Sequence, residues 1–150
     1  MVVDATMCAV HLLFGAVWTG AVVFATLAIL PLARDGVANA EPLARVVGTL
    51  RNLSRVSALA VLASGGHMAG TGYTVGSLTG TTRGHLVLGM VALWFVLMVL
   101  VEVGGGKLAT GFDEKKVREP AREARPFFLA GSLVAVLVWL DAGLLAAGFA

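Results

Sequence analysis

Four long apolar segments, separated by shorter polar ones, set the hydrophobic pattern of this chain. They cover residues 6–32, 42–73, 84–103 and 126–149. Each holds about the 20 predominantly apolar residues that an α-helix needs to cross a bilayer. Because a backbone in lipid must satisfy its own hydrogen bonds, the pattern predicts an all-α protein with four membrane-spanning helices in one bundle. Residues 1–150 then form a single transmembrane domain.

Prolines and glycines mark the expected helix ends. Pro31 discourages continuation of the first helix, whereas Pro42 and Pro126 suit the first turns of the second and fourth helices. The three glycines at 104–106 are expected to end the third helix, since glycine is unfavourable inside helices.

The polar connections also have distinct compositions. Residues 72–83 are rich in glycine and threonine, which predicts a turn region, and Thr81 or Thr82 can cap the helix that follows. Residues 107–125 form the one long polar segment, in which we expect a short surface helix.

The composition excludes a soluble globular protein. Hydrophobic residues make up 58% of the chain and charged residues 13%, against the roughly 25% charged residues of soluble domains. The net charge of +2 does not indicate a nucleic-acid partner, because the basic residues fall into interhelical segments. Cys8 is the single cysteine, which excludes an internal disulfide. No basic residue precedes Arg34, so a cleavable signal peptide is not expected.

The charges predict how the helices are oriented. Ten of the eleven Lys and Arg residues lie after the first helix, at the start of the second, or between the third and fourth; Arg83 alone lies between the second and third. Basic segments of membrane proteins stay in the cytoplasm. The sequence therefore predicts a multi-pass protein of the plasma membrane with cytoplasmic basic loops and both termini on the outer side.

This orientation places the three histidines in the same half of the membrane. His11 lies about five residues inside the outer start of the first helix, roughly 8 Å deep. His67 lies near the outer end of the second helix, and His85 opens the third. Asp141 lies on the outer side of the fourth helix. Ionisable residues within membranes usually face the bundle interior and serve a site.

Haem is the favoured cofactor. Two neutral imidazoles from facing helices hold b-type haems in helical bundles, so we expect His11 to pair with either His67 or His85. Gly15 and Gly66 leave room for the macrocycle. The expected function is electron transfer or a redox reaction near the outer face.

Two further residue types bear on this haem site. Asp141 can orient a ligating histidine by accepting a hydrogen bond from its second ring nitrogen. Trp18, Trp94 and Trp139 lie near the middle of their helices and could pack on a macrocycle, although core or lipid contact is the more ordinary role.

Copper binding or transport is the alternative. Imidazole and thioether ligands suit Cu(I), and Met7 shares a helix face with His11. The candidate copper ligands are Met7, His11, His67 and His85, with Cys8, Met68 and Met90 nearby in the pattern. A third interpretation has no cofactor: the histidines bond to carbonyl groups, and the chain is a scaffold or subunit. The expected partners are the lipid bilayer and either a second copy or a redox protein.

The first helix resembles a known family. Its motif is His11-x6-Trp18-x-Gly20, followed by Phe24 and by Leu-Pro-Leu at 30–32. This motif is similar to the opening helix of the copper-resistance D (CopD) family and of the related HemJ-type protoporphyrinogen oxidases. Residues 82–88 look like the start of a later helix in that group. The resemblance implies a four-helix membrane unit in which His11 is functional, with copper uptake associated with one branch and haem binding and porphyrin oxidation with the other.

Overall fold

The computed structural model describes residues 1–148, and every regular element in that range is a helix. The elements are α1 (Val2–Phe24), the π-helical turn η1 (Ala25–Ile29), α2 (Leu30–Asp35), α3 (Ala40–Gly72), α4 (Val75–Gly80), α5 (Thr82–Asp113) and α6 (Arg118–Ala146). α1, η1 and α2 follow one another without a break and form one long helix. The prediction of an all-α fold is confirmed.

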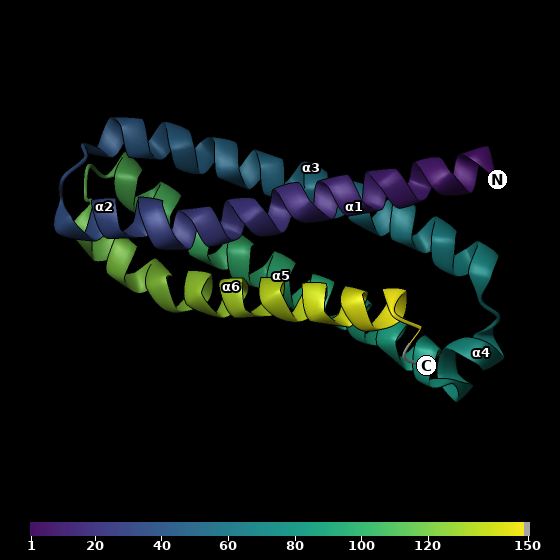
Figure 1. Ribbon diagram of the computed structural model, residues 1–150. Coiled ribbons are helices and arrows are strands. Elements are labelled where there is room, and N and C mark those ends of the chain that lie inside the picture. Colours follow the sequence, from purple (N-terminus) through teal and green to yellow (C-terminus); the bar gives the residue numbers. More distant parts are fainter. Residues whose placement is uncertain (149–150) are drawn as a thin grey trace.

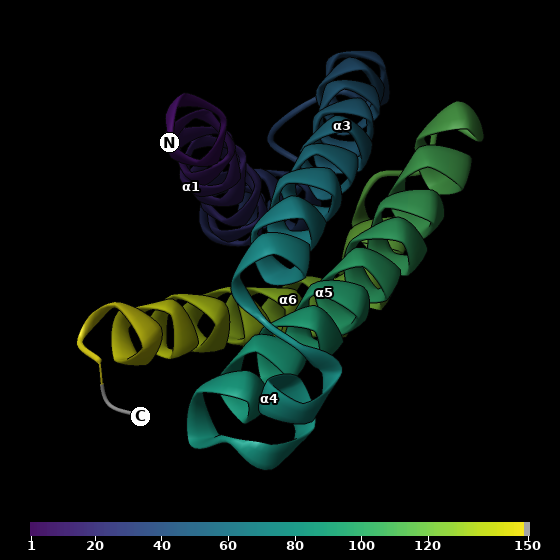
Figure 2. The same cartoon turned by 90° about the vertical axis from the view of Figure 1, so that its right-hand side faces the viewer.

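The long helices form a four-helix bundle with neighbours running in opposite directions (Figure 1). The start of α1, the short helix α4 and the end of α6 lie at one end, here called the termini end. The connections after α2 and after α5 lie at the opposite end, called the α2 end. Figure 2 shows the bundle from its termini end, where the four long helices spread apart.

The four long helices are apolar enough to cross a membrane. They contain 29 to 34 residues each, counting Val2–Asp35 as one helix, whereas a span needs about 20. Large apolar side chains cover their outer surface; Leu27, Leu59 and Phe95 are each at least 60% exposed. Contact with lipid removes the free-energy cost that such side chains would have in water. The structure fits a multi-pass membrane protein.

The hydrophobic core lies mainly in the half of the bundle near the α2 end. Val22, Ala33, Val47 and Leu108 are at most 2% exposed and pack in one cluster. Phe128 of α6 fills the same cluster and lies against Gly104 of α5. The termini half contributes few residues to this core, because the helices diverge there.

The first helix is longer than expected, because the chain accommodates Pro31. The prediction was residues 6–32, but the helix covers 2–35. A proline ring clashes with the carbonyl group four residues earlier, and the wider π-helical turn η1 just before it relieves this clash. Thr26 in this turn donates to the carbonyl oxygen of Phe128 at 3.1 Å, which ties the turn to α6. The helix ends at Gly36, whose φ of +70° is unfavourable for other residues.

The prediction that the glycines at 104–106 end the third helix was wrong. α5 continues through them to Asp113. A Cβ atom on Gly104 would lie 3.0 Å from the Phe128 ring, and one on Gly105 would lie 3.0 Å from Cγ of Arg51. These glycines therefore serve close packing of α5 against α6 and α3, and that packing outweighs their low helix propensity.

The fourth helix begins eight residues before its expected start. It runs from Arg118, with Pro120 in its first turn and the exposed Pro126 inside it, and it ends at Ala146. Part of the expected end at 149 lies outside the described residues. The polar residues 107–125 form the end of α5, the connection at 114–117 and the start of α6, and not a separate surface helix.

The expected turn at 72–83 contains the short helix α4. Thr81 caps α5, as one of the two expected caps, by accepting a hydrogen bond from the backbone N–H of Gly84 at 3.0 Å. The polar oxygen of the cap satisfies one of the free N–H groups at the start of the helix.

Replacing Gly111 with alanine is expected to destabilise the α5–α6 hairpin. A Cβ atom there would overlap the ring of Pro120, which cannot rotate away. Overpacking of this kind costs about 1–3 kcal/mol, so the free energy of unfolding in detergent should fall by that amount. Gly106→Ala is the matched control, because its Cβ would meet nothing within 4 Å. Equal stability of the two variants would contradict the close contact.

Candidate cofactor cavity

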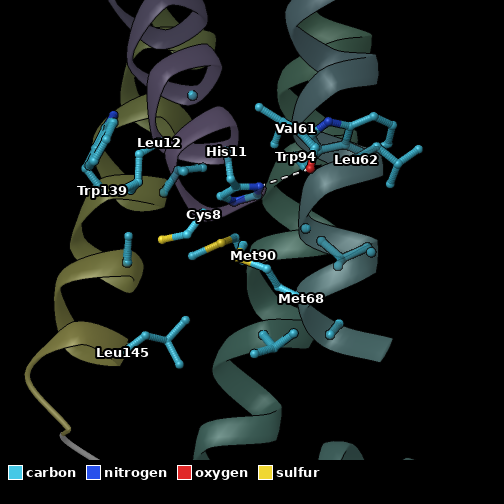
Figure 3. Close-up of a pocket in the computed structure, with 18 of the residues that line it drawn as sticks. Cys8, His11, Leu12, Val61, Leu62, Met68, Met90, Trp94, Trp139 and Leu145 are labelled. Atoms are coloured by element: carbon cyan, nitrogen blue, oxygen red, sulfur yellow. Dashed lines mark hydrogen bonds between the residues drawn. The ribbon is translucent and has the colours of Figure 1, made fainter. Parts of the chain in front are cut away.

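A cavity of about 460 Å³ lies between α1, α3, α5 and α6 in the termini half of the bundle. Its volume falls within the roughly 300–1,000 Å³ of small-molecule and cofactor sites. The walls are mainly apolar, and Figure 3 shows residues from several helices pointing into the same space. The divergence of the helices creates this cavity, so it exists only because the core does not extend to the termini end.

His11 is the only one of the three histidines that lines the cavity. Its Nδ1 lies 3.1 Å from the carbonyl oxygen of Val61 and 3.2 Å from the hydroxyl oxygen of Ser64. A carbonyl oxygen can only accept, so Nδ1 carries the hydrogen and donates it (Figure 3). In the neutral ring, Nε2 then keeps its lone pair. This is the tautomer that a metal-ligating imidazole requires.

Gly65 allows the His11 ring to reach α3. A Cβ atom at Gly65 would lie 2.8 Å from Cε1 and 3.2 Å from Nδ1 of His11. Any larger residue would therefore push the ring away from the Val61 carbonyl group. From the sequence, Gly66 was expected to leave room for a cofactor. The contact of Gly65 with His11 was not expected, since the sequence does not show which glycine faces α1.

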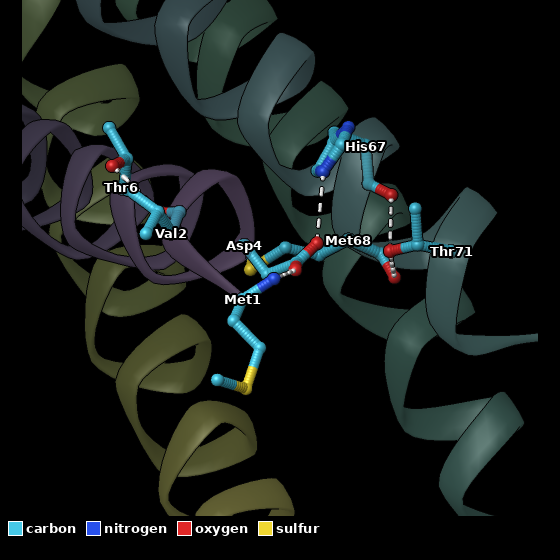
Figure 4. Close-up of polar contacts among 7 residues, drawn as sticks. All are labelled: Met1, Val2, Asp4, Thr6, His67, Met68 and Thr71. Atoms are coloured by element: carbon cyan, nitrogen blue, oxygen red, sulfur yellow. Dashed lines mark hydrogen bonds and ion pairs between the residues drawn. The ribbon is translucent and has the colours of Figure 1, made fainter.

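The other two histidines have different partners. His67 Nε2 lies 3.3 Å from a carboxylate oxygen of Asp4, which also pairs with the amino group of Met1 at 2.8 Å (Figure 4). His85 Nε2 lies 2.8 Å from the carbonyl oxygen of Thr79. Neither ring lines the cavity. The structure does not bring His67 or His85 to the space that His11 faces.

The remaining candidate residues divide in the same way. Gly15 and Gly66 line the cavity, and a Cβ atom on either would meet nothing within 4 Å. Met7 is not among the lining residues. Asp141 is 9% exposed, and its Oδ2 has no hydrogen-bond partner among residues 1–148. It does not line the cavity and forms no hydrogen bond with a histidine in that range.

Three sulfur-containing side chains line the cavity together with His11. They are Cys8 of α1, Met68 of α3 and Met90 of α5 (Figure 3). From the sequence, these three residues were expected near the candidate copper ligands but were not assigned as ligands. Within the described part of the chain, no group of three or more His, Cys, Asp and Glu residues could hold a metal ion. A bare metal ion in the cavity would therefore need thioether ligands in addition to His11 and Cys8.

Aromatic side chains and one cation complete the lining. Trp18, Trp94 and Trp139 all face the cavity. Trp94 donates from Nε1 to the carbonyl oxygen of Ala58 at 3.1 Å, and Trp139 donates to the Thr19 hydroxyl at 2.9 Å. Arg83 is the one charged lining residue in the described range, and its Nε donates to the Tyr73 hydroxyl at 3.0 Å. The cavity thus combines apolar walls with a cation at the termini end.

A second polar cluster lies outside the cavity, between α3 and α5. The Glu102 carboxylate accepts hydrogen bonds from Arg55 at 2.7 and 2.8 Å and from Arg51 at 3.3 Å. The pairing of Glu102 was not evident from sequence, because the two arginines lie on α3 and Glu102 lies on α5.

Replacing Glu102 with glutamine is expected to lower the free energy of unfolding by about 1–3 kcal/mol, since the partly buried Arg51 and the half-exposed Arg55 lose their counter-charge. Glu102 and Arg51 are 28% and 26% exposed as side chains, so solvent screens them only in part. Glu41→Gln is the control: Glu41 pairs with Arg45 where both side chains are 79% exposed, and its loss should cost little. Thermal unfolding in detergent measures both; equal effects would contradict a structural role of the cluster.

Comparison of the chain with protein-family models, with curated proteins and with solved structures finds no match. The resemblance of the first helix to the CopD and HemJ group therefore stays a prediction.

Proposed function

We propose that this protein binds a b-type haem in the cavity, with His11 as an axial ligand, and transfers electrons near one face of the membrane. The observation that carries the proposal is the state of the His11 ring. Its Nδ1–H is engaged by the Val61 carbonyl group, and the ring lines a cavity of cofactor size between four helices. A hydrogen-bonded Nδ1–H orients such a ring and raises the basicity of Nε2.

The rest of the lining suits a macrocycle with acidic substituents. Trp18, Trp94 and Trp139 offer flat apolar surfaces, and Gly15 and Gly66 leave open space. Arg83 supplies a positive charge at the termini end, suited to the propionate groups of a haem. Without such a charge, two carboxylates beside an apolar cavity would be costly.

Each part of the chain has a defined task in this proposal. Haem, when bound, supplies a one-electron couple. His11 would hold the iron, the Val61 carbonyl group and Gly65 position the His11 ring, and the apolar walls would exclude water. From the sequence, His67 or His85 was expected to be the second ligand, but neither ring lines the cavity, so the proposal assigns the iron to His11 alone among the histidines. Met68 and Met90 are the thioether groups that face it.

The charge distribution supports an orientation in the membrane. Apart from Arg83, the Lys and Arg residues lie in the half of the bundle near the α2 end or in its connections. We infer that the α2 end is cytoplasmic and that the termini end, with the cavity, is on the outer side of the plasma membrane. Haem would then exchange electrons with a partner at the outer face.

Copper binding is the second candidate, favoured by one observation. The sulfur atoms of Cys8, Met68 and Met90 share the cavity with the His11 ring (Figure 3). Thiolate, thioether and imidazole ligands together suit Cu(I). Met7 was the expected thioether ligand, but Met68 and Met90 take this place in the proposal because Met7 does not line the cavity.

The visible spectrum and the metal content of the purified protein test the proposal. Haem predicts a Soret band from protein produced in haem-replete cells. Copper predicts a colourless protein with bound copper, whose content falls in Met90→Leu and Cys8→Ser but not in Met7→Leu. A colourless protein without copper would overturn both candidates and leave the scaffold interpretation, in which the triple His→Ala variant assembles normally.

A further inference from the structure

Five buried side-chain polar atoms have no hydrogen-bond partner in the described part of the chain; one is Oδ2 of Asp141 on α6, and the other four lie on α1 and α3. These four are Nε1 of Trp18, Oγ of Ser57, Oγ of Ser54 and Nε of Arg51. Ser57, Trp18 and Ser54 are 0%, 2% and 3% exposed. Leaving such a group unpaired costs about 1–3 kcal/mol each, and buried polar groups without protein partners usually bond to ordered water. Because these four unpaired atoms lie in one region, we expect them to share bound molecules that form hydrogen bonds with them.

The four atoms follow one line through the bundle. Ser57, Ser54 and Arg51 recur every three residues on α3, which makes each the neighbour of the next at steps of about 4.5 Å along the axis. Trp18 of α1 lies level with Ser57 and is the first member of the line. The contact of His11 with Ser64 sets the register of these antiparallel helices, and Trp18 lies seven residues beyond His11 while Ser57 lies seven before Ser64.

The line joins the two polar features of the molecule. At one end, Trp18 lines the cavity beside Trp94, which donates to the carbonyl oxygen of Ala58, the residue after Ser57. At the other end, Arg51 bonds to Glu102, and Glu102 bonds to Arg55, whose side chain is 49% exposed. The Glu102 ion-pair cluster is therefore open to the outside of the protein through Arg55. The cavity floor at Trp18 lies about two helical turns from Arg51 along the bundle axis.

We propose that Ser57, Ser54 and Arg51 bind a short chain of ordered water molecules that connects the floor of the His11 cavity with the Glu102 ion-pair cluster. Water fits these groups because it both donates and accepts. The indole and guanidinium N–H groups need a hydrogen-bond acceptor, and the serine hydroxyls can either donate or accept a hydrogen bond. One water bridging two groups spans about 5.6 Å at 2.8 Å per bond, which covers a 4.5 Å step.

Such a chain would move protons. In each hop, one O–H bond breaks as the next forms, so a proton enters at one end, another leaves at the other, and no co-reactant is consumed. At the α2 side of the path the proton would exchange with water around the half-exposed Arg55 of the Glu102 cluster, and the cavity floor is its destination. This proton path goes beyond haem or copper binding and does not depend on which of them the cavity holds.

Hydrogen exchange at the three indole N–H groups tests the proposal. The protein, as purified, is labelled with ¹⁵N-tryptophan in lipid nanodiscs and transferred to D₂O, and Trp→Phe variants assign the three signals. Trp94 and Trp139 donate to protein oxygens and serve as internal controls. We expect Trp18 to exchange at least about tenfold faster than Trp94. Exchange as slow as that of Trp94 would overturn the proposal.

Two variants show whether solvent reaches the Trp18 indole N–H along α3 or through the cavity. The double variant Ser54→Ala/Ser57→Ala removes two of the groups that hold the water, and we expect it to slow exchange at Trp18 about tenfold. Thr49→Ala is the control, because the exposed Thr49 hydroxyl donates within its own helix to Arg45. Unchanged Trp94 and Trp139 signals show that the variant is folded. An unchanged Trp18 rate in the folded double variant would overturn the path.

Discussion

Replacing His11 with alanine is expected to abolish the Soret band of the purified protein. His11 is the one histidine whose ring lines the cavity, and its Nδ1–H is held by Val61 so that Nε2 can bind iron. Without it, the lining of the cavity offers no other imidazole. Loss of an iron–imidazole bond should lower haem affinity by well over tenfold, or about 1.4 kcal/mol for each factor of ten. The ratio of Soret to protein absorbance measures it.

Two further variants test whether His11 acts alone. His67→Ala and His85→Ala should keep the Soret band, because their rings bond to Asp4 and to the Thr79 carbonyl oxygen outside the cavity. Adding free imidazole to His11→Ala should restore part of the band, since the small ligand can enter the space that the ring left. Loss of the band in His67→Ala or His85→Ala would contradict the single-histidine site.

The Gly65→Ala variant is expected to weaken cofactor binding almost as strongly, although position 65 carries no ligand. Its Cβ would lie 2.8 Å from Cε1 of His11, closer than non-bonded atoms tolerate. Either the ring leaves the Val61 carbonyl group or α1 moves away from α3, at about 1–3 kcal/mol. The expected result is a loss of haem affinity of about tenfold or more, measured by haem titration of the apoprotein.

Gly66→Ala is the matched control for this prediction. Gly66 is the next residue on α3, has the same helix propensity and also lines the cavity, but its Cβ would meet nothing within 4 Å. It should bind haem as the wild type does. If both variants bind haem normally, the contact between Gly65 and His11 does not position the ligand.

The fold was predictable in its outline but not in its helix ends. Four helix-length apolar segments in lipid can form little other than a helical bundle. The ends depended on glycines and prolines, whose local preferences the packing overrides. Gly104 stays helical because Phe128 packs against it, and Pro31 stays helical because η1 widens the turn before it.

The candidate site was predictable only in its first residue. His11 stands out because an ionisable ring in an apolar helix is costly without a role. Its partners depend on how each helix is rotated about its axis, and a rotation of one residue, about 100°, moves a side chain from the interior to the lipid. For this reason Met68 and Met90, rather than His67 and His85, line the cavity with His11.

Hydrophobicity and charge along the chain were sufficient to identify the four helices, their antiparallel order and the separation of basic residues to one end, since these depend on segment length and composition. The cavity, the Val61–His11–Gly65 contacts and the Glu102 cluster required the packed bundle. Each of them brings together residues 45 or more positions apart. Whether such residues come into contact depends on how the helices are rotated and how far they diverge, and the order of residues along the chain does not give this information.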